Sequence, residues 1–214
     1  MITNTTVRSR ACVPIQTKYL GIRDYAETWQ AMKNFTAGRS NSTLDEIWLL
    51  QHFPVYTQGI AGKPEHLLYR NDIPVIHTDR GGQVTYHGPG QLIIYTLLEF
   101  RRLGFHVREL VTQLEKAVID LLEEYCIKAE SKQEAPGVYV KGEKIASLGL
   151  KIKHGYCYHG IALNIDMDLQ PFFAINPCGY QGLQMTQMVD QGVSDDIEVI
   201  SQKIAEKLIM RLSK

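Results

Sequence analysis

A cysteine held at a turn is the first candidate for chemistry in this chain. Cys178 lies in the sequence Ile-Asn-Pro-Cys-Gly-Tyr of residues 175–180. Pro177 disfavours the helical region for the residue before it, and Gly179 frees the dihedral angles that follow. A thiol exposed at such a turn becomes a nucleophile when a neighbouring group takes its proton. A buried packing cysteine is the alternative, and that alternative suits Cys12, Cys126 and Cys157 better.

A lysine in an apolar strand is the second candidate. Residues 144–153 read as a strand, and a two-residue period places Lys144 on the same face as Ala146, Leu148, Leu150 and Ile152. A lysine on an apolar face is poorly hydrated, which predicts a lowered pKa and an amine able to accept a proton near neutral pH. The alternative is that Lys144 lies at the strand end and extends its amine to solvent.

The third candidate is a glycine-rich segment. Residues 80–91 read Arg-Gly-Gly-Gln-Val-Thr-Tyr-His-Gly-Pro-Gly-Gln. Glycines allow the backbone to approach a ligand closely, and successive N–H groups beside Arg80 could form an anion-binding nest. The segment contains neither a Walker sequence nor GxGxxG, and a tight loop between strands is the alternative. The histidines show no HxH or HExxH spacing, so no zinc site is predicted. His87 and His159 are candidates for an orienting group or an alternative base.

The elements that must position these residues form an α+β pattern. Helical periodicity predicts helices over residues 22–35, 107–125 and about 196–212, the last capped by Ser194 or Asp195. Strands are predicted over residues 46–51, 75–77, 91–98, 138–140, 144–153 and 156–165, the last two joined in a hairpin through His154-Gly155. Because strands cluster and helices are few, we expect an α+β fold. A single catalytic domain over residues 1–214 is predicted, since no linker divides the chain.

Composition narrows the class of protein. The 214 residues carry 23 basic and 23 acidic side chains, and 44% are hydrophobic. This balance is typical of a globular domain and argues against disorder or a basic nucleic-acid-binding domain. No CxxC pair, signal peptide or long apolar run is visible, so we expect a reduced, soluble, cytoplasmic protein that does not bind membranes.

Taken together, the segments resemble one family. Arg-Gly-Gly-Gln-Val-Thr-Tyr-His-Gly-Pro-Gly-Gln, Lys-Ile-Ala-Ser-Leu-Gly-Leu, His-Gly-Ile-Ala-Leu-Asn and Asn-Pro-Cys-Gly occur here in that order. Over about residues 44–188 they closely resemble the lipoyl/octanoyl transferases, also called lipoate–protein ligase B. The resemblance implies mixed β-sheets flanked by helices, similar to the catalytic module of lipoate and biotin protein ligases.

The resemblance also implies an activity and its residues. Members transfer an octanoyl group from acyl carrier protein to a protein lysine in lipoate biosynthesis, without ATP or metal. The implied acceptors are the lipoyl domains of 2-oxoacid dehydrogenase E2 subunits and the glycine cleavage H protein. By motif, Cys178 resembles the acyl-accepting thiol and Lys144 the acid/base lysine. The implied substrate-binding residues are Arg80, Gly81, Gly82, Gln83, Val84, Thr85, Tyr86, His87, Ser147, Leu148, Gly149, Gly160, Ile161 and Ala162.

The chemistry expected from these residues is a two-step transfer through a thioester on Cys178, with Lys144 moving the protons. The small residues Ser147, Gly149, Gly160 and Ala162 are expected to leave a channel for the alkyl chain, and N–H groups near Cys178 and Gly179 to hold the oxyanion. An ATP-dependent lipoate or biotin protein ligase on the same fold is the nearest alternative. A thioesterase and a non-catalytic binding module for acyl carrier or lipoyl domains are the others.

Overall fold

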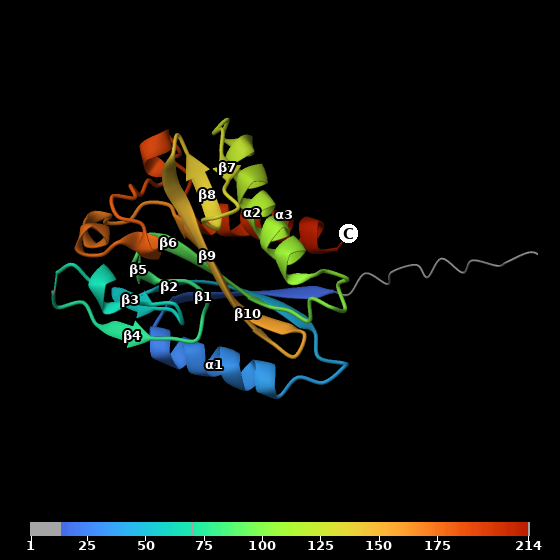
Figure 1. Cartoon of the computed structure of the whole chain (residues 1–214). Helices are drawn as coiled ribbons and strands as arrows, with labels where there is room; N and C mark the ends of the chain where they lie inside the picture. Colours follow the sequence, from blue (N-terminus) through green and yellow to red (C-terminus); the bar gives the residue numbers. More distant parts are fainter. Residues whose placement is uncertain (1–13, 70, 214) are drawn as a thin grey trace, which may run out of the picture.

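The computed structural model describes residues 14–69 and 71–213, so Cys12 and the N-terminal segment lie outside the described residues. Two mixed β-sheets and three helices make up the fold (Figure 1). The larger sheet contains, in spatial order, β1 (Ile15–Arg23), β2 (Asp45–His52), β6 (Gln91–Leu97), β10 (Tyr156–Asn164), β9 (Glu143–Lys153), β8 (Gly137–Val140) and β7 (Glu130–Ser131). The smaller sheet contains β4 (Val75–His77), β3 (Val55–Gln58) and β5 (Val84–His87).

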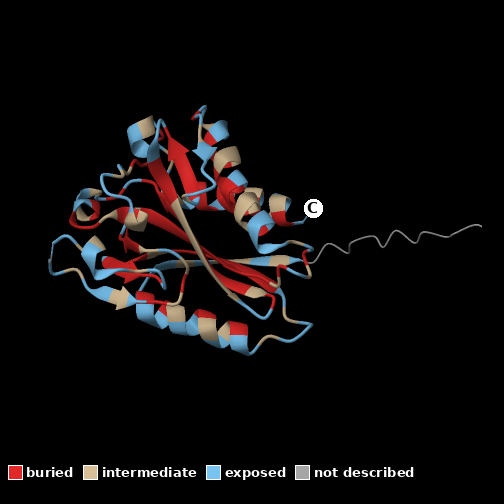
Figure 2. Cartoon of the chain, in the orientation of Figure 1, coloured by how far each residue is buried: buried red, intermediate tan, exposed pale blue. Residues whose placement is uncertain are grey.

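The helices cover both faces of the larger sheet. Helices α2 (Val107–Glu124) and α3 (Ile197–Leu212) pack on one face, and α1 (Tyr25–Ala37) packs on the other (Figure 1). Successive side chains of a strand point to opposite faces of the sheet, so each strand contributes to the core on both sides. In β2, Ile47 and Leu49 face α2 and α3, whereas Trp48 and Leu50 face α1. The middle strands are therefore buried on both sides, and the outer faces of the helices are exposed (Figure 2). No helix in residues 14–69 and 71–213 is long and apolar enough to cross a membrane.

Short 3-10 helices carry the connections around the smaller sheet. They span Pro64–His66 (η1), Gln170–Ala174 (η2), Pro177–Gly179 (η3) and Val189–Gln191 (η4). The segment before η3 pairs with the segment after η1 through a bridge between Leu67 and Ile175. This pairing anchors the turn that carries Cys178 to the smaller sheet.

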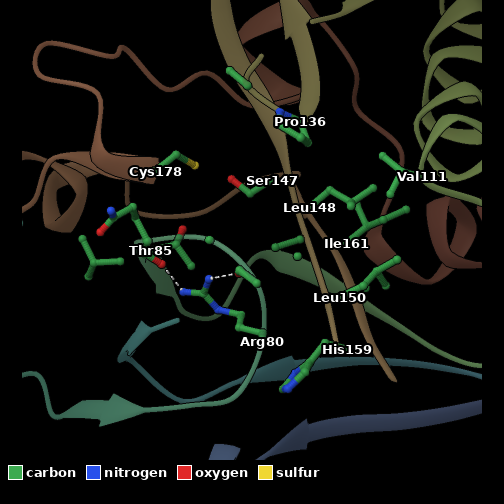
Figure 3. Close-up of a pocket in the computed structure, with 18 of the residues that line it drawn as sticks. Arg80, Thr85, Val111, Pro136, Ser147, Leu148, Leu150, His159, Ile161 and Cys178 are labelled. Atoms are coloured by element: carbon green, nitrogen blue, oxygen red, sulfur yellow. Dashed lines mark hydrogen bonds between the residues drawn. The ribbon is translucent and has the colours of Figure 1, made fainter. Parts of the chain in front are cut away.

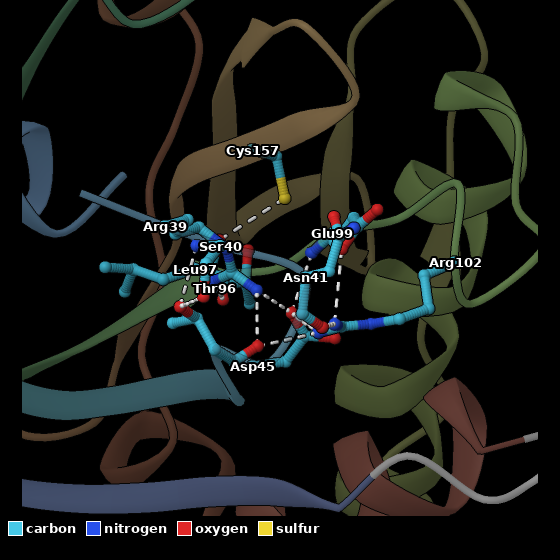
Figure 4. Close-up of polar contacts among 10 residues, drawn as sticks. Arg39, Ser40, Asn41, Asp45, Thr96, Leu97, Glu99, Arg102 and Cys157 are labelled. Carbon is cyan, nitrogen blue, oxygen red and sulfur yellow. Dashed lines mark hydrogen bonds and ion pairs between the residues drawn. The ribbon is translucent and has the colours of Figure 1, made fainter. Parts of the chain in front are cut away.

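A buried ion cluster ties the loop after α1 to the end of β6 (Figure 4). The fully buried Asp45 carboxylate binds Arg39 and lies 3.0 Å from Arg102 Nη2. It also accepts the N–H of Glu99 at 2.8 Å, and Arg39 donates to the Leu97 carbonyl at 2.9 Å. These donors all reach Asp45 Oδ1 and offset part of the cost of burying the carboxylate, so the cluster has a structural role.

The predicted architecture is confirmed in its main elements. The three predicted helices and six predicted strands are present, and His154-Gly155 turns the β9–β10 hairpin. The boundaries of the third helix differ slightly, since Asp196 is its N-cap residue in place of Ser194 or Asp195. Cys157 is buried, as predicted, whereas Cys126 is exposed, so the packing interpretation of Cys126 is wrong.

The strands β1, β3, β5 and β7 were not predicted. β5 lies inside the glycine-rich segment, where the flanking glycines suggest a continuous loop. The side chains of β5 are nevertheless all buried, and its partner β3 pairs with it along its whole length. Pairing with β3 therefore overrides the local preference of this segment for a turn.

Candidate active site

Lys144 and Cys178 meet in space although 34 residues separate them in the chain. The Lys144 amine donates a hydrogen bond to the Cys178 sulfur at an Nζ–Sγ distance of 3.1 Å. Both side chains line the same cavity, which has a volume of about 410 Å³. The predicted pairing of these two side chains is therefore present in the structure.

Lys144 is buried because the local backbone turns its side chain inward. Its side chain is only 1% exposed, so extension to solvent is excluded. One extended segment, residues 184–186, holds its backbone: Lys144 N donates to the Gln184 carbonyl at 2.9 Å, and Thr186 N donates to the Lys144 carbonyl at 3.0 Å. Gly137 makes room for the aliphatic chain, since a Cβ at that position would lie 2.4 Å from Lys144 Cε.

A β-bulge corrects the predicted face of Lys144. Opposite β8, the pairing skips Ile145, since Val138 pairs with Ala146 and Tyr139 pairs with Lys144. Ile145 and Ala146 consequently both join the core under α2 and α3. The strict two-residue period fails here, because the extra residue of a bulge breaks the alternation of a strand. Lys144 therefore does not share the face of Ala146.

The backbone of Cys178 adopts a left-handed conformation within η3. Its φ angle is +56°, which is uncommon for a residue other than glycine and is frequently found at functional sites. Gly179 N donates to the Asn176 carbonyl at 2.9 Å, and Tyr180 N donates to the Pro177 carbonyl at 3.1 Å. The expected use of the Gly179 N–H for an oxyanion is therefore wrong, because this N–H already has an acceptor within the turn.

The pKa of Lys144 is shifted in the direction opposite to the prediction. Burial on its own lowers this pKa, but the negative charge of Cys178, its hydrogen bond to the amine and the nearby Tyr139 outweigh burial and raise it. Nζ also lies 5.4 Å from the centre of the Tyr139 ring, where a cation is favoured. The site thus favours the protonated form of Lys144 next to the Cys178 sulfur.

The glycine-rich segment forms one wall of the cavity, and the Arg80 side chain holds this segment in place through hydrogen bonds. The Arg80 guanidinium is buried and donates to the Thr57 side chain and carbonyl, to the Gly81 carbonyl and to the Gln83 carbonyl at distances between 2.5 and 3.0 Å. Gly81 N in turn donates to the Leu150 carbonyl of β9 at 2.9 Å. The protein itself engages the Arg80 guanidinium and the Gly81 N–H, so these donors are not left to bind an anion.

The cavity brings together nearly all of the predicted substrate-binding residues. Figure 3 shows the wall from β9 and β10 facing the glycine-rich segment, with Cys178 at one end. Tyr86 is the exception, because it alternates to the other face of β5 and packs on Tyr56 and Phe172. The predicted residues that line the cavity are Arg80, Gly81, Gly82, Gln83, Val84, Thr85, His87, Ser147, Leu148, Gly149, Gly160, Ile161 and Ala162.

The glycines of the β9–β10 hairpin let neighbouring backbone segments pack closely against it, in addition to leaving space in the cavity. Gly149 and Gly160 face each other across β9 and β10. A Cβ on Gly149 would lie 2.9 Å from the Gly81 carbonyl oxygen, and one on Gly160 would lie 2.0 Å from the Ile94 carbonyl oxygen. Glycine is needed at both positions so that the glycine-rich segment and β6 can approach the hairpin.

The two candidate histidines have structural partners on the inner side of the cavity. His87 hydrogen-bonds with Gln91 at 2.7 Å and with Thr57 at 3.1 Å. His159 Nε2 lies 3.0 Å from Asp79 Oδ1. Burial lowers the pKa of each imidazole, so both are neutral, and neither replaces Lys144 beside Cys178.

Residues outside the recognised motifs also line the cavity. Val107 and Val111 of α2 and Tyr95 of β6 contribute to its walls, as does Pro136 in the connection before β8. In the sequence, the valines are part of a regular amphipathic repeat, and Tyr95 is part of an apolar strand. These patterns are the same for core residues, so only the structure identifies them as cavity residues.

Comparisons with known proteins agree with this geometry. The family model for the lipoyl protein ligase A/B catalytic domain matches residues 24–209. The chain belongs to this family. An octanoyltransferase of Nitrosospira multiformis is 62% identical over 200 residues, which cover 94% of this chain and 93% of that protein. An octanoyltransferase of Azoarcus sp. is 56% identical, covering 94% and 88% respectively.

Solved structures show the same fold at low sequence identity. A lipoate–protein ligase A bound with ATP superposes with a TM-score of 0.77 at 12% identity, covering 92% of this chain and 85% of that chain. A biotin protein ligase from Aquifex aeolicus superposes with a TM-score of 0.58 at 15% identity, covering 92% and 70%. The predicted family, fold and octanoyltransferase activity are confirmed, and the ligase alternative has less support because the ligases share only the fold.

Proposed function

We propose that this octanoyltransferase works through a thioester on Cys178, with Lys144 as its acid and base. The donor is octanoyl-acyl carrier protein, and the acceptor is the lysine of a lipoyl domain. The observation that carries the proposal is the 3.1 Å contact between the Lys144 amine and the Cys178 sulfur in a shared cavity. A nucleophile within hydrogen-bond reach of its base is the arrangement that covalent catalysis requires.

In the first half-reaction, Lys144 takes the proton from the Cys178 thiol. The thiolate attacks the carbonyl carbon of the thioester that joins octanoate to the carrier's phosphopantetheine. The C–S bond to the carrier then breaks, and the leaving thiolate receives the proton from the Lys144 ammonium. The raised pKa of Lys144 favours its ammonium form, which is the form that supplies the proton to the leaving thiolate.

In the second half-reaction, the acceptor lysine attacks the thioester on Cys178. A free lysine has a pKa of about 10.4 and is almost wholly protonated near neutral pH, so it needs a base. The acceptor ammonium first loses one proton to solvent and attacks as the neutral amine. Lys144, which is neutral after the carrier thiol has left, then removes the second proton from the attacking nitrogen. Cys178 leaves as a thiolate, which restores the starting pair.

The apolar part of the cavity suits a straight acyl chain. Leu148, Leu150, Ile161 and Val111 lie together on one side of the cavity, and Arg80 lies on the other (Figure 3). Burial of each methylene contributes about 0.8 kcal/mol, so an octanoyl chain gains on the order of 5 kcal/mol. This gain is large enough to hold the chain while two protein partners exchange.

The reaction needs neither ATP nor a metal ion in this proposal, because conversion of a thioester to an amide is already downhill. In the part of the chain that the structure describes, no group of three or more His, Cys, Asp or Glu side chains is arranged to hold a metal. Activity in ATP-free buffer containing a chelator tests this point directly. A requirement for ATP with free octanoate would instead support the ligase alternative.

The partners follow from the chemistry. We infer octanoyl-acyl carrier protein as donor, and lipoyl domains of 2-oxoacid dehydrogenase E2 subunits and the glycine cleavage H protein as acceptors. We place the enzyme in the cytoplasm, as a single catalytic domain that binds neither nucleic acid nor membrane. Immunoblotting of lipoyl-domain proteins after deletion of the gene tests the set of acceptors.

The intact mass of the protein tests the covalent step. Wild-type enzyme incubated with octanoyl-acyl carrier protein, without acceptor, is expected to gain one octanoyl group. Cys178→Ala is expected to gain none, whereas Cys126→Ala, which removes an exposed thiol outside the cavity, keeps the adduct. An octanoyl adduct on Cys178→Ala, or none on wild type, would refute the thioester mechanism.

The same incubation separates the remaining alternatives. Release of free octanoate as the main product would indicate a thioesterase. Tight binding of the donor without any change in it would indicate a non-catalytic binding module.

A further inference from the structure

Two residues that line the active-site cavity each carry a buried polar atom without a partner. Buried polar atoms in proteins nearly always have hydrogen-bond partners, so each exception in a cavity marks a position where a ligand can pair. Among the described residues, several buried side-chain atoms have no partner, but only Thr85 Oγ1 and His159 Nδ1 belong to residues that line this cavity. Thr85 is 5% exposed and His159 is 1% exposed.

The backbone of β5 directs Thr85 toward the nucleophile. Tyr86 packs with the apolar cluster on one face of the strand, whereas Thr85 and His87 alternate to the opposite face and line the cavity. β5 also packs directly against η3, which carries Cys178. In Figure 3, Thr85 and Ser147 lie on either side of the space in front of the Cys178 side chain.

The hydroxyl of Thr85 is free, whereas that of its neighbour is not. Thr57 stands directly opposite Thr85 in the smaller sheet. The Thr57 hydroxyl accepts from Arg80 and hydrogen-bonds with His87. Thr85, which lines the cavity, therefore keeps a hydroxyl that no other group of the described residues engages, whereas the Thr57 hydroxyl is engaged by Arg80 and His87.

The two unpartnered atoms differ in what they can bind. His159 Nε2 donates to the Asp79 carboxylate, and burial lowers the pKa of this imidazole, so its Nδ1 is a hydrogen-bond acceptor. A thioester carbonyl is also only an acceptor and cannot pair with it. The Thr85 hydroxyl can donate, and it is the atom of the two that matches a carbonyl oxygen.

We propose that the Thr85 hydroxyl is the oxyanion donor of both half-reactions. This inference rests on the proposed thioester mechanism. When the Cys178 thiolate bonds to the carbonyl carbon, the π electron pair of the C=O bond moves to oxygen, and Thr85 donates a hydrogen bond to that oxygen. When the carbonyl re-forms, the carrier thiolate leaves and takes a proton from Lys144, so Thr85 itself neither gains nor loses a proton.

The test compares three variants by the rate of octanoyl adduct formation on Cys178. Thr85→Val keeps the shape but removes the hydroxyl, and Thr85→Ser keeps the hydroxyl. Thr36→Val is the matched control, since Thr36 Oγ1 is also buried and unpartnered but Thr36 does not line the cavity. Loss of one oxyanion donor typically slows a reaction about a hundredfold.

The expected result is a fall of that size for Thr85→Val, partial or full activity for Thr85→Ser and no change for Thr36→Val. A second readout separates this role from a structural one: Thr85→Val should unfold at the same or a higher temperature, because the removed hydroxyl has no partner to lose. Introduced into Cys178→Ala, it should also leave the affinity for octanoyl-acyl carrier protein unchanged.

Three results would overturn the inference: wild-type acylation by Thr85→Val, equal slowing of Thr85→Ser, or equal slowing of Thr36→Val. Each of these leaves the thioester mechanism standing if Cys178→Ala still forms no adduct. Acylation of Cys178→Ala would refute the mechanism itself, whatever Thr85→Val does.

Discussion

The buried His52 makes the stability of this enzyme depend on pH. His52 is fully buried at the end of β2, with Nδ1 2.9 Å from the Arg23 carbonyl oxygen and Nε2 2.7 Å from the Tyr95 hydroxyl. A neutral imidazole satisfies both contacts by donating to the carbonyl and accepting from the hydroxyl. Burial lowers the pKa of His52 to about 4.

The sign and size of the effect follow from that shift. An unfolded histidine has a pKa of about 6.5. Between pH 6.5 and 4, His52 is therefore protonated in the unfolded chain but neutral in the folded chain, and this difference lowers the free energy of unfolding as the pH falls. The stabilisation is therefore complete above pH 6.5 and is lost as the pH falls to 4. A difference of about 2.5 pKa units corresponds to roughly 3 kcal/mol. Burial also lowers the pKa values of His87 and His159, so these residues add to the loss of stability at low pH.

Urea unfolding at about pH 7.5 and pH 4.5 measures the effect, since most of the His52 contribution is lost between these values. His52→Asn should be less stable than wild type at the higher pH but should lose about 2–3 kcal/mol less on acidification. The exposed His77 provides the control, and His77→Gln should lose as much as wild type. If His52→Asn and wild type lost equal stability, the assignment of the acid sensitivity to His52 would be wrong.

Two further predictions concern the support of the active site. Gly137→Ala places a Cβ 2.4 Å from Lys144 Cε and 2.5 Å from the Ala146 carbonyl, so octanoyl adduct formation should slow at least about tenfold. Gly142→Ala is its control, because Gly142 also has a positive φ but has no atom within 4 Å of the added Cβ. Arg80→Lys should raise KM for the octanoyl donor and lower the free energy of unfolding by about 2 kcal/mol, since an ammonium cannot replace the planar contacts to Thr57 and Gln83. Steady-state kinetics and urea unfolding measure both quantities, with the exposed Arg101→Lys as control.

Contrary outcomes for these variants are equally specific. If Gly137→Ala and Gly142→Ala slowed octanoyl adduct formation to the same extent, backbone strain, and not displacement of Lys144, would explain the slowing of Gly137→Ala. An unchanged KM for Arg80→Lys would show that the glycine-rich segment keeps its shape without the guanidinium.

Local patterns in the sequence predicted most of the fold. The apolar repeat of residues 107–125 is long and regular, and the helix α2 follows it closely. The sequence predicted the hairpin of β9 and β10 because His154-Gly155 separates two apolar stretches. β1, β3 and β5 were missed, because their pairing partners are distant in the chain and the glycines around β5 favour a turn by themselves.

The sequence by itself determined which side chains are the candidates for the chemistry. The identities of Cys178 and Lys144 and the order of the motifs around them indicate the family, and the comparisons confirm that family. The Pro-Cys-Gly sequence favours a turn at Cys178 through local covalent geometry, which the sequence records directly.

Only the tertiary structure decided how those side chains act. The bulge at Ile145 and the space above Gly137 bring the amine to the sulfur, and that contact raises the pKa of Lys144 where its apolar neighbours in sequence predicted the reverse. Likewise, Thr57 and Thr85 are both buried strand threonines, and only the placement of Arg80 leaves one hydroxyl free. A pKa and a free hydrogen-bond donor depend on neighbours within a few ångströms, and in a folded chain most of those neighbours come from distant residues.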